Sequence, residues 1–406
     1  MPLILEGIRV LEVAEYGMVP SAGAVLGEWG ADVIKIEHAH RGDPIRGLST
    51  AGVAPGTNGF TPMHEPVNRN KRSVGVDIGV PEGREIILDL ARQADVFLTS
   101  FLPSARRKLG LEVEDLRAVN PKIIYGRGSA HGQLGDEAEA GGFDGLTYWL
   151  RCGIAMGTIP TGCTDLTMQP GPGFGDVQTG MTLAGGIAGA LFHRERTGEA
   201  LEVDTSLLAQ GCWAMMGSVV AVNLAGLDEM PRDHRDRKNA PNPLMNTYRT
   251  SDNRWFILGM LQPDRYWADL CRAIGHEELI EDPRFADITV RTQHKDACIE
   301  TLDKIFGSAP LAHWEERLAT QGGPWSSAQR VGDLGRDKQA WANGYFQTVD
   351  YGDGRSITLG SAPVQFNKEA GVLSRAPEHG ESTEEVLLEL GHSWEDISRF
   401  REVGAI

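Results

Sequence analysis

The chain contains few cysteines, and their spacing fits neither a metal site nor a disulfide framework. There are five, odd in number, far apart and without a CxxC pair: Cys152, Cys163, Cys212, Cys271 and Cys298. This pattern excludes a structural zinc class and a disulfide-rich secreted class, so we expect reduced thiols in packing positions. The 11 histidines show no HxH or HExxH spacing, and no metal site is predicted.

Basic residues and long apolar runs are also scarce. The 39 lysines and arginines are outnumbered by 56 aspartates and glutamates, and the resulting formal charge of −17 excludes a general nucleic-acid or anionic-membrane surface. No apolar run approaches the roughly 18 residues of a membrane span. The start, MPLILEGIRVLEV, lacks a basic n-region and a small-residue cleavage site. We therefore expect a cytoplasmic globular protein with no nucleic-acid or membrane partner.

Strand and helix signals alternate over the N-terminal third of the chain. The strand-like segments are IRVLEVA, ADVIKIE, KRSVGVDI, DVFLTSF and KIIYGRGS, and between them lie helix-like segments such as SAGAVLGEWG and PEGREIILDLARQA. This alternation predicts an α/β fold with a doubly wound parallel sheet, whose ligands bind at the carboxyl ends of the strands. The first strand is not followed by GxGxxG, so a nicotinamide or flavin cofactor is not predicted.

The length of 406 residues suits two domains. The polar stretch 228–243 resembles a linker, and TYRTSDNRWFILGM after it has the pattern of a β-hairpin. We expect a large Rossmann-like domain over 1–227, completed by the C-terminal segment from about residue 330 to 406. A smaller α+β domain, with its linkers, is expected over 228–329.

One carboxylate stands out in GPGFGDVQTGM, residues 171–181. Asp176 lies where a long helix rich in Gly and Ala begins, with no His or Cys beside it. The commoner role for an acid at this position is an N-cap. The alternative is a nucleophile, because a carboxylate with an unperturbed pKa of about 3.9 is ionised at pH 7 and attacks an acyl carbonyl without an adjacent base.

Basic residues form three small groups near predicted strand ends. The groups are Arg69, Lys71 and Arg72; Arg106, Arg107 and Lys108; and Arg41 and Arg46. Each group alone is typical of a solvated surface, whereas the three together in an acidic protein suit a ligand with phosphates.

Taken in order, these stretches resemble the class III CoA-transferase family, of the formyl-CoA and carnitine CoA-transferase type. The similar segments are LEGIRVLEVAEYGMVPSAGAVLGEWGADVIKIE, GDPIRG, NRNKRSVGVDI, NPKIIYGRGSAHGQLG, GFGDVQTGMTLAGGIAGALFHRERTGEALEVDTSLL and APEHGESTEEVLLELGHS. The resemblance implies an acyl-CoA and a carboxylic acid as substrates, no permanently bound cofactor, and Asp176 as the catalytic residue. It also implies a homodimer whose two chains interlock like linked rings.

The resemblance also indicates where CoA binds. By position, the family's CoA contacts correspond to Tyr16, Arg41, Arg72, Phe101, Lys108 and His131. Three positions depart from the commoner pattern: Ser100 replaces Asn, Ser104 replaces Gly and Lys108 replaces Arg. Lysine keeps the charge of arginine but not its fork of donors, so contacts to the adenosine phosphates are expected to differ in detail.

In the family's transferase mechanism the aspartate forms an anhydride with the acyl group and then a thioester with CoA. The family also includes α-methylacyl-CoA racemases, which need a His in a GHD segment; here Phe143 occupies that position in GFD, and Phe cannot move a proton. A racemase that uses another base therefore ranks second, and a CoA-binding module without covalent chemistry ranks third. Tyr148, Trp149, Trp213 and Trp325 are candidates to line an acyl pocket, with core packing as the alternative.

Overall fold

The structure is a computed structural model that describes residues 1–48, 60–230 and 236–406. Residues 231–235 of the expected linker lie outside the described part. The remainder of that linker contains only one short helical turn, η4 (Arg237–Asn239).

The described chain forms two compact units. The larger unit is built from Met1–Gly157, Leu166–Ala221 and Asp337–Ile406, and the smaller from Thr158–Asp165 and Val222–Arg336. The C-terminal segment thus belongs to the larger unit. The predicted boundaries assign Thr158–Asp165 to the large domain, but this segment belongs to the smaller unit. The sequence did not show this, because a turn-rich segment carries no signal for the core that it joins.

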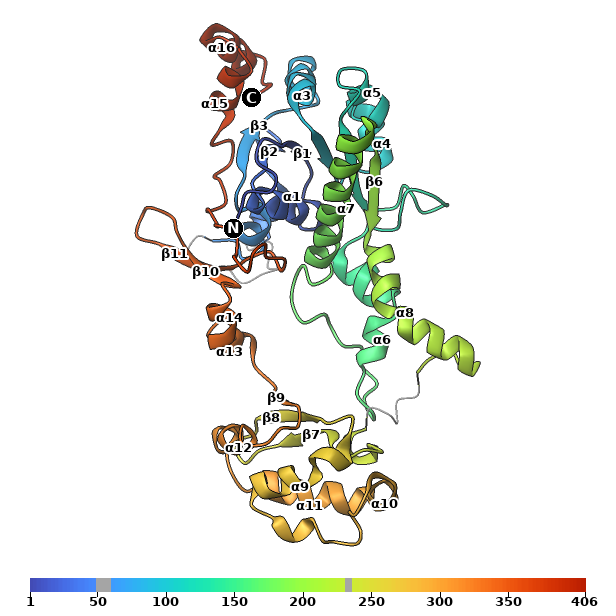
Figure 1. Cartoon of the computed structure of the whole chain (residues 1–406). Helices are drawn as coiled ribbons and strands as arrows, with labels where there is room; N and C mark the ends of the chain where they lie inside the picture. The colour runs from blue at the N-terminus through green and yellow to red at the C-terminus, as the bar shows by residue number, and fades with distance from the viewer. Residues whose placement is uncertain (49–59, 231–235) are drawn as a thin grey trace. The chain divides into compact units, whose positions relative to one another are not determined.

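One parallel sheet of six strands organises the larger unit (Figure 1). In spatial order the strands are β3 (Arg72–Gly75), β2 (Asp32–Glu37), β1 (Arg9–Val13), β4 (Val96–Thr99), β5 (Ile124–Ser129) and β6 (Glu202–Ser206). The first five are the apolar segments that predict a doubly wound α/β sheet, and this prediction is confirmed. β6 is missing from the predicted strands because this edge strand, EVDTS, is largely polar.

Helices cover both faces of the sheet. One face packs against α3 (Pro81–Gln93), α5 (Val113–Arg117) and the C-terminal helices α15 (Thr383–Glu389) and α16 (Trp394–Glu402). The other packs against α1 (Met18–Glu28) and α7 (Asp176–Thr197). Successive strand residues alternate between the two cores: Leu11 and Phe97 join the first, Val10 and Val96 the second.

The two helices α1 and α7 approach each other closely at a glycine. A Cβ atom at Gly180 would lie 1.8 Å from Ser21 Oγ and 2.5 Å from Met18 O. Only glycine leaves room for this contact, which explains the glycine at position 180. The contact brings the first turns of both helices to the same edge of the sheet.

Several shorter elements complete the N-terminal and central parts of the chain. They are η1 (Pro44–Gly47), α2 (His64–Asn68), α4 (Pro103–Leu109), the π-helical turn η2 (Gly145–Arg151) and α6 (Ile154–Thr158). Towards the C-terminus, α14 (Lys338–Ala342) precedes a hairpin of β10 (Phe346–Asp350) and β11 (Ser356–Gly360).

The smaller unit is α+β, as the sequence predicts. Its antiparallel sheet contains β7 (Met245–Arg249), β8 (Trp255–Gly259) and β9 (Trp325–Ser327), and the first two form the expected hairpin. The helices are α9 (Pro263–Ile274), η5 (Glu277–Leu279), α10 (Ile288–Gln293), α11 (Lys295–Phe306), α12 (Leu311–Leu318) and α13 (Val331–Leu334).

The helix α8 (Leu207–Ala225) is apolar on all sides yet mostly exposed. With a mean hydropathy of 1.5 it is long and apolar enough to cross a membrane by length and composition alone. The expectation that no apolar stretch approaches that length is therefore wrong, because Gln210, Ser218 and Asn223 interrupt the run without making it polar. Trp213 is 70% exposed and Leu224 is 85% exposed, so α8 presents a surface that water solvates poorly.

Candidate active site

A cavity of about 550 Å³ lies at the carboxyl ends of β1, β4 and β5. The strand order reverses between β1 and β4, and in parallel α/β sheets this switch point is where ligands bind. The loops after β1 and β4, the end of β5 and the start of α7 supply the lining. Its residues include Glu15, Tyr16, Gly17, Ser100, Phe101, Gly128 and Asp176.

Asp176 does not cap α7. The N-cap residue is Gly175, and its backbone N–H donates to Asp144 Oδ1 at 3.0 Å, so a buried carboxylate at the start of η2 performs the capping. Among the residues that the structure describes, no hydrogen bond or ion pair reaches the Asp176 carboxylate. The N-cap interpretation of Asp176 is thus wrong, and its side chain is free for another role.

The Asp176 carboxylate lies against the first turn of α1. Gly17 is the N-cap of α1, and a Cβ atom built on Gly17 would lie 2.5 Å from Asp176 Oδ2. Any larger residue at position 17 would overlap the carboxylate. The unpaired N–H groups and the dipole at the N-terminus of a helix favour negative charge. The first turn of α1 therefore suits an oxyanion that forms at the Asp176 carboxylate during a reaction.

Burial raises the pKa of Asp176 to about 7, and the negative charge of Asp144 adds to the shift. The expectation of an unperturbed carboxylate is therefore wrong, because local sequence does not show desolvation. A group with this pKa is substantially ionised at pH 7 and is poorly solvated, and both properties suit a nucleophile.

Two of the predicted CoA contacts, Tyr16 and Phe101, line the cavity. Tyr16 has a backbone φ of +65°, which is unusual for a residue with a large side chain. Its ring packs edge-to-face on Phe143 with a centroid distance of 5.2 Å. The Phe at the position of the racemase histidine therefore forms part of an aromatic wall beside Asp176.

A model of CoA-transferase family III matches residues 5–383, a range that includes every residue that lines the cavity. The chain belongs to CoA-transferase family III. It is similar over 98% of both chains, at 32% identity, to (R)-2-hydroxy-4-methylpentanoate CoA-transferase of Clostridioides difficile. It is 29% identical to cinnamoyl-CoA:phenyllactate CoA-transferase of Clostridium sporogenes, over 98% of this chain and 96% of that one.

A solved structure agrees with this assignment. The CAIB/BAIF family protein from Brucella suis superposes with a TM-score of 0.80 at 27% identity, over 95% of this chain and 99% of that one. The protein is therefore an enzyme, and the family's substrates are acyl-CoA thioesters and carboxylic acids. Among the described residues, no group of three or more His, Cys, Asp or Glu side chains could hold a metal ion.

Three other predicted CoA contacts of this transferase lie near the cavity without lining it. Lys108 is exposed in the last turn of α4. Arg41 is exposed, and its charge opposes the rise in the pKa of Glu15 that burial causes. His131 follows the lining residue Ala130, and its Nδ1 lies 3.2 Å from Arg151 Nη1.

The structure does not bring Arg72 to the cavity. Arg72 begins β3 and therefore lies at the amino end of the sheet, opposite the edge where the cavity opens. Its guanidinium pairs with Asp32 at 2.7 Å and with Glu389 at 2.8 Å. The sequence shows a basic residue near a strand but not at which end of the strand it lies.

Most of the basic groups that seemed suited to phosphates are engaged within the protein. Arg69 pairs with Glu28, Lys71 with Glu12, Arg107 with Glu139 and Arg46 with Glu37, while Arg106 donates to Phe101 O. The prediction that the groups jointly bind phosphates is therefore not supported for these residues. Within the described chain, Arg41 and Lys108 remain without an ion pair.

None of the four aromatic residues predicted to line an acyl pocket lines this cavity. Tyr148 and Trp149 are 3% and 6% exposed, Trp213 is on the exposed α8, and Trp325 packs against the core of the smaller unit. Apart from Phe101 and Phe143, the larger apolar side chains of the lining are ones that the sequence did not single out. They are Met18, Leu102, Leu146 and Leu207.

Sequence reasoning also missed Asp144 and Gly17. In the sequence, Asp144 is noted only as the last residue of GFD. Its contact with the start of α7 joins positions 31 residues apart, which no local pattern indicates. Gly17 was one glycine among 50, and its role follows from the approach of α1 to α7.

The raised pKa of Asp176 predicts a pH-dependent effect on stability. A carboxyl group whose pKa is higher in the folded state favours folding at low pH, and this contribution is lost as the pH rises through about 7. Asp176→Asn should therefore be more stable than the wild type at pH 8, by on the order of 1–4 kcal/mol. The difference should shrink towards pH 4, as measured by urea unfolding at each pH.

Asp136→Asn is the control, because Asp136 is an exposed acid outside the cavity lining. It should unfold like the wild type at both pH values. An Asp176→Asn variant that is no more stable than the wild type at pH 8 would contradict the burial argument.

Proposed function

We propose that this transferase moves CoA from a donor acyl-CoA to an acceptor carboxylic acid, with Asp176 as the covalent nucleophile. The observation that carries the proposal is the half-buried, poorly solvated Asp176 carboxylate, which lines the cavity and has no hydrogen-bonding partner among the described residues. A carboxylate that served stability would have a hydrogen-bonding partner, since burying an unpaired acid is unfavourable.

Four steps account for the transfer. An Asp176 oxygen attacks the donor thioester carbonyl, and the C–S bond breaks to give a mixed anhydride and CoA thiolate. The thiolate attacks the Asp176 carbonyl and releases the donor acid, which leaves Asp176 as a CoA thioester. The acceptor carboxylate displaces CoA from that thioester, and the thiolate then attacks the acceptor carbonyl of the second anhydride. The products are the new acyl-CoA and the restored Asp176 carboxylate.

The surrounding residues have distinct roles in this proposal. Gly17 leaves space at the carboxylate for the acyl group, and N–H groups of the first turn of α1 are candidate donors to the oxyanions. Tyr16 and Phe101 contact CoA within the cavity. Arg41, Lys108 and His131 lie at its periphery, where they suit the phosphates; Arg72 does not fit this role.

The cavity wall also favours a class of acid. Met18, Phe143, Leu146 and Leu207 present apolar side chains to the space around Asp176. We propose that the transferred acids carry an apolar tail, unlike formate or oxalate. The two named relatives support this proposal, since 4-methylpentanoate and the phenyl-bearing cinnamoyl and phenyllactate groups have such tails.

The two alternatives are less well supported. Proton exchange at an α-carbon needs two groups that move protons, and no histidine lines the cavity in the described part of the chain. A module without covalent chemistry does not fit a full-length similarity to named transferases.

We also propose that the enzyme is a cytoplasmic homodimer, interlocked as the resemblance implies. A single described chain leaves the apolar helix α8 uncovered, with Trp213 and Leu224 mostly exposed. A second copy would bury this surface without a membrane, as large obligate interfaces do. Interlocked chains separate only when one of them opens.

Trapping tests the covalent role of Asp176. Incubation with an apolar acyl-CoA and hydroxylamine should convert Asp176 to a hydroxamate, because hydroxylamine attacks the activated carbonyl. Peptide mass spectrometry locates the modification, and Asp136→Asn is the matched control that should be modified at Asp176 like the wild type. Modification elsewhere, or deuterium entering the α-carbon without CoA exchange, would contradict the transferase mechanism.

Light scattering tests the dimer. The wild type should have the mass of two chains and should not exchange subunits with a tagged copy unless it is unfolded. Trp213→Asp combined with Leu224→Asp should abolish the dimer or its folding, whereas Trp394→Asp, a similar change at the 57% exposed Trp394 in α16, should not. A monomeric wild type would overturn the proposal.

A further inference from the structure

We propose that Asp43 and Lys35 are positioning residues for the reaction at Asp176. They hold the turn formed by residues 14–17 in the conformation that brings Gly17 and the Tyr16 ring to the cavity. This inference rests on the proposed function, because it assigns a role towards the Asp176 nucleophile.

The turn after β1 adopts a backbone conformation that Tyr16 does not favour. Its φ of +65° places a large side chain in the left-handed region, which is unfavourable and persists only where the surrounding structure imposes it. This backbone conformation bears on the proposed reaction, because the next residue, Gly17, contacts the Asp176 carboxylate. Because Tyr16 prefers another backbone conformation, hydrogen bonds to the chain around it are needed to hold this one; we call these contacts anchors.

Asp43 and Lys35 supply these anchors. The Tyr16 N–H donates to Asp43 Oδ1 at 3.1 Å, and Lys35 Nζ donates to Ala14 O at 2.8 Å. The two anchors are joined, because Lys35 Nζ lies 2.9 Å from Asp43 Oδ2. One ion pair therefore holds the turn at two points, Ala14 and Tyr16.

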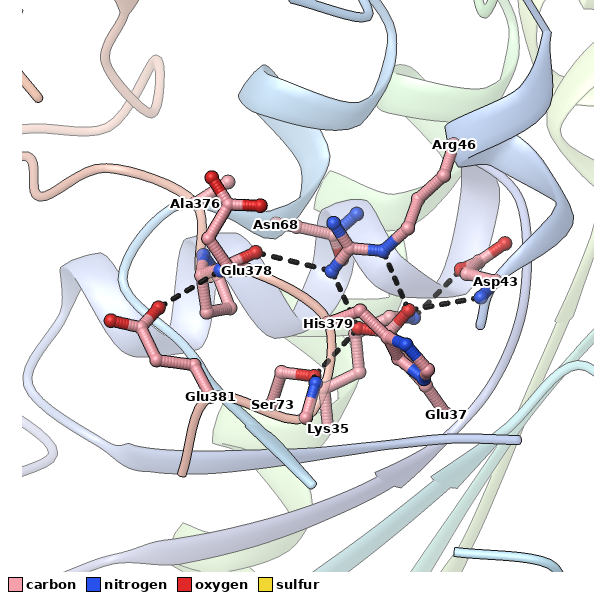
Figure 2. A network of polar contacts seen from close by, with 12 residues as sticks. Lys35, Glu37, Asp43, Arg46, Asn68, Ser73, Ala376, Glu378, His379 and Glu381 are labelled. Atoms are coloured by element: carbon pink, nitrogen blue, oxygen red, sulfur yellow. Dashed lines mark hydrogen bonds and ion pairs between the residues drawn. The ribbon is translucent and has the colours of Figure 1, made fainter. Parts of the chain in front are cut away.

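Asp43 is itself fixed from two directions. It is 2% exposed, its N–H donates to Glu37 Oε2 at 2.9 Å, and its Oδ1 also accepts from Ile45 N–H at 3.0 Å at the start of η1. Figure 2 shows Asp43 beside Lys35 and Glu37 in this network.

The network continues into the C-terminal segment. Arg46 donates to Glu37 Oε1 at 2.7 Å and to Pro377 O at 3.1 Å, and Ser73 Oγ donates to Glu37 Oε1 at 2.7 Å (Figure 2). These contacts fix Glu37, which in turn fixes the backbone of Asp43. The anchor of the turn is thus built into the sheet and the C-terminal segment of the larger unit.

Stability alone is a poor explanation for this ion pair. Lys35 is fully buried and also lies 3.3 Å from Glu12, which pairs with the buried Lys71 at 2.8 Å. Removing such charges from water is expensive, and buried ion pairs replaced by apolar residues of similar volume often leave stability unchanged or higher. What apolar residues cannot supply are an acceptor for Tyr16 N–H and a donor for Ala14 O.

The test compares Asp43→Ala with Glu28→Gln. Glu28 is buried at the far end of α1, where it pairs with Arg69 at 2.7 Å and accepts from Ala362 N–H at 2.8 Å, so it is a matched buried ion pair away from the turn. The readout is the rate at which hydroxylamine modifies Asp176 at a saturating concentration of an apolar acyl-CoA, divided by the amount of folded enzyme. KM and the melting temperature are measured for each variant as well.

Asp43→Ala should lower this rate by about 10–100-fold, the effect of a small displacement of reacting groups, while Glu28→Gln changes it by less than about 3-fold. Asp43→Asn keeps the acceptor for Tyr16 N–H and should recover most of the lost rate. A rate in Asp43→Ala equal to that of the wild type, or an equal loss in Glu28→Gln, would overturn the positioning role.

If Asp43→Ala does not fold, Lys35→Met takes its place, because it removes the donor to Ala14 O and keeps Asp43. It should lower the rate by at least about 10-fold, and a rate within about 3-fold of Glu28→Gln would overturn the inference. Failure of the wild type to modify Asp176 would instead contradict the proposed function, so the two failures are distinguishable.

Discussion

The site depends on one contact, the close approach of α1 to α7. Gly180 lets the helices touch at Met18 and Ser21, and Gly17 lets the first turn of α1 reach the Asp176 carboxylate. Because the helices begin at the same edge of the sheet, the carboxylate of one lies beside the N-terminus of the other. Bulk at either glycine would separate the acid from the helix that favours its charge.

The electrostatics follow from that packing. Asp144 takes over the capping of α7, so Asp176 is left without a partner in the described chain and its pKa rises. A poorly solvated carboxylate is less stable than a solvated one, and in the proposed mechanism the N–H groups of the first turn of α1 are candidate donors to the oxyanions. The unfavourable electrostatics of the cavity thus include an Asp176 carboxylate that burial makes harder to ionise.

Sequence patterns predicted the α/β sheet and the α+β second unit because these leave local signals, such as the apolar periodicity of β1 to β5. The position of Asp176 alone favoured an N-cap; its catalytic role came from the family resemblance and stays a prediction. The role of Arg72 was not predictable, since proximity to a strand does not show which end of it faces a ligand. The apolar lining, Asp144 and the Asp43–Lys35 pair are contacts between distant segments, and no local pattern records them.

The central claim, that CoA passes to the acceptor through an anhydride formed on Asp176, is tested most directly by isotope transfer. An acceptor acid labelled with ¹⁸O in its carboxylate attacks the Asp176 thioester, and the bridging oxygen stays on Asp176 when CoA leaves with the acceptor. After a single turnover with donor acyl-CoA, the peptide that contains Asp176 should carry one ¹⁸O atom. New acyl-CoA formed without label in that peptide would contradict the account.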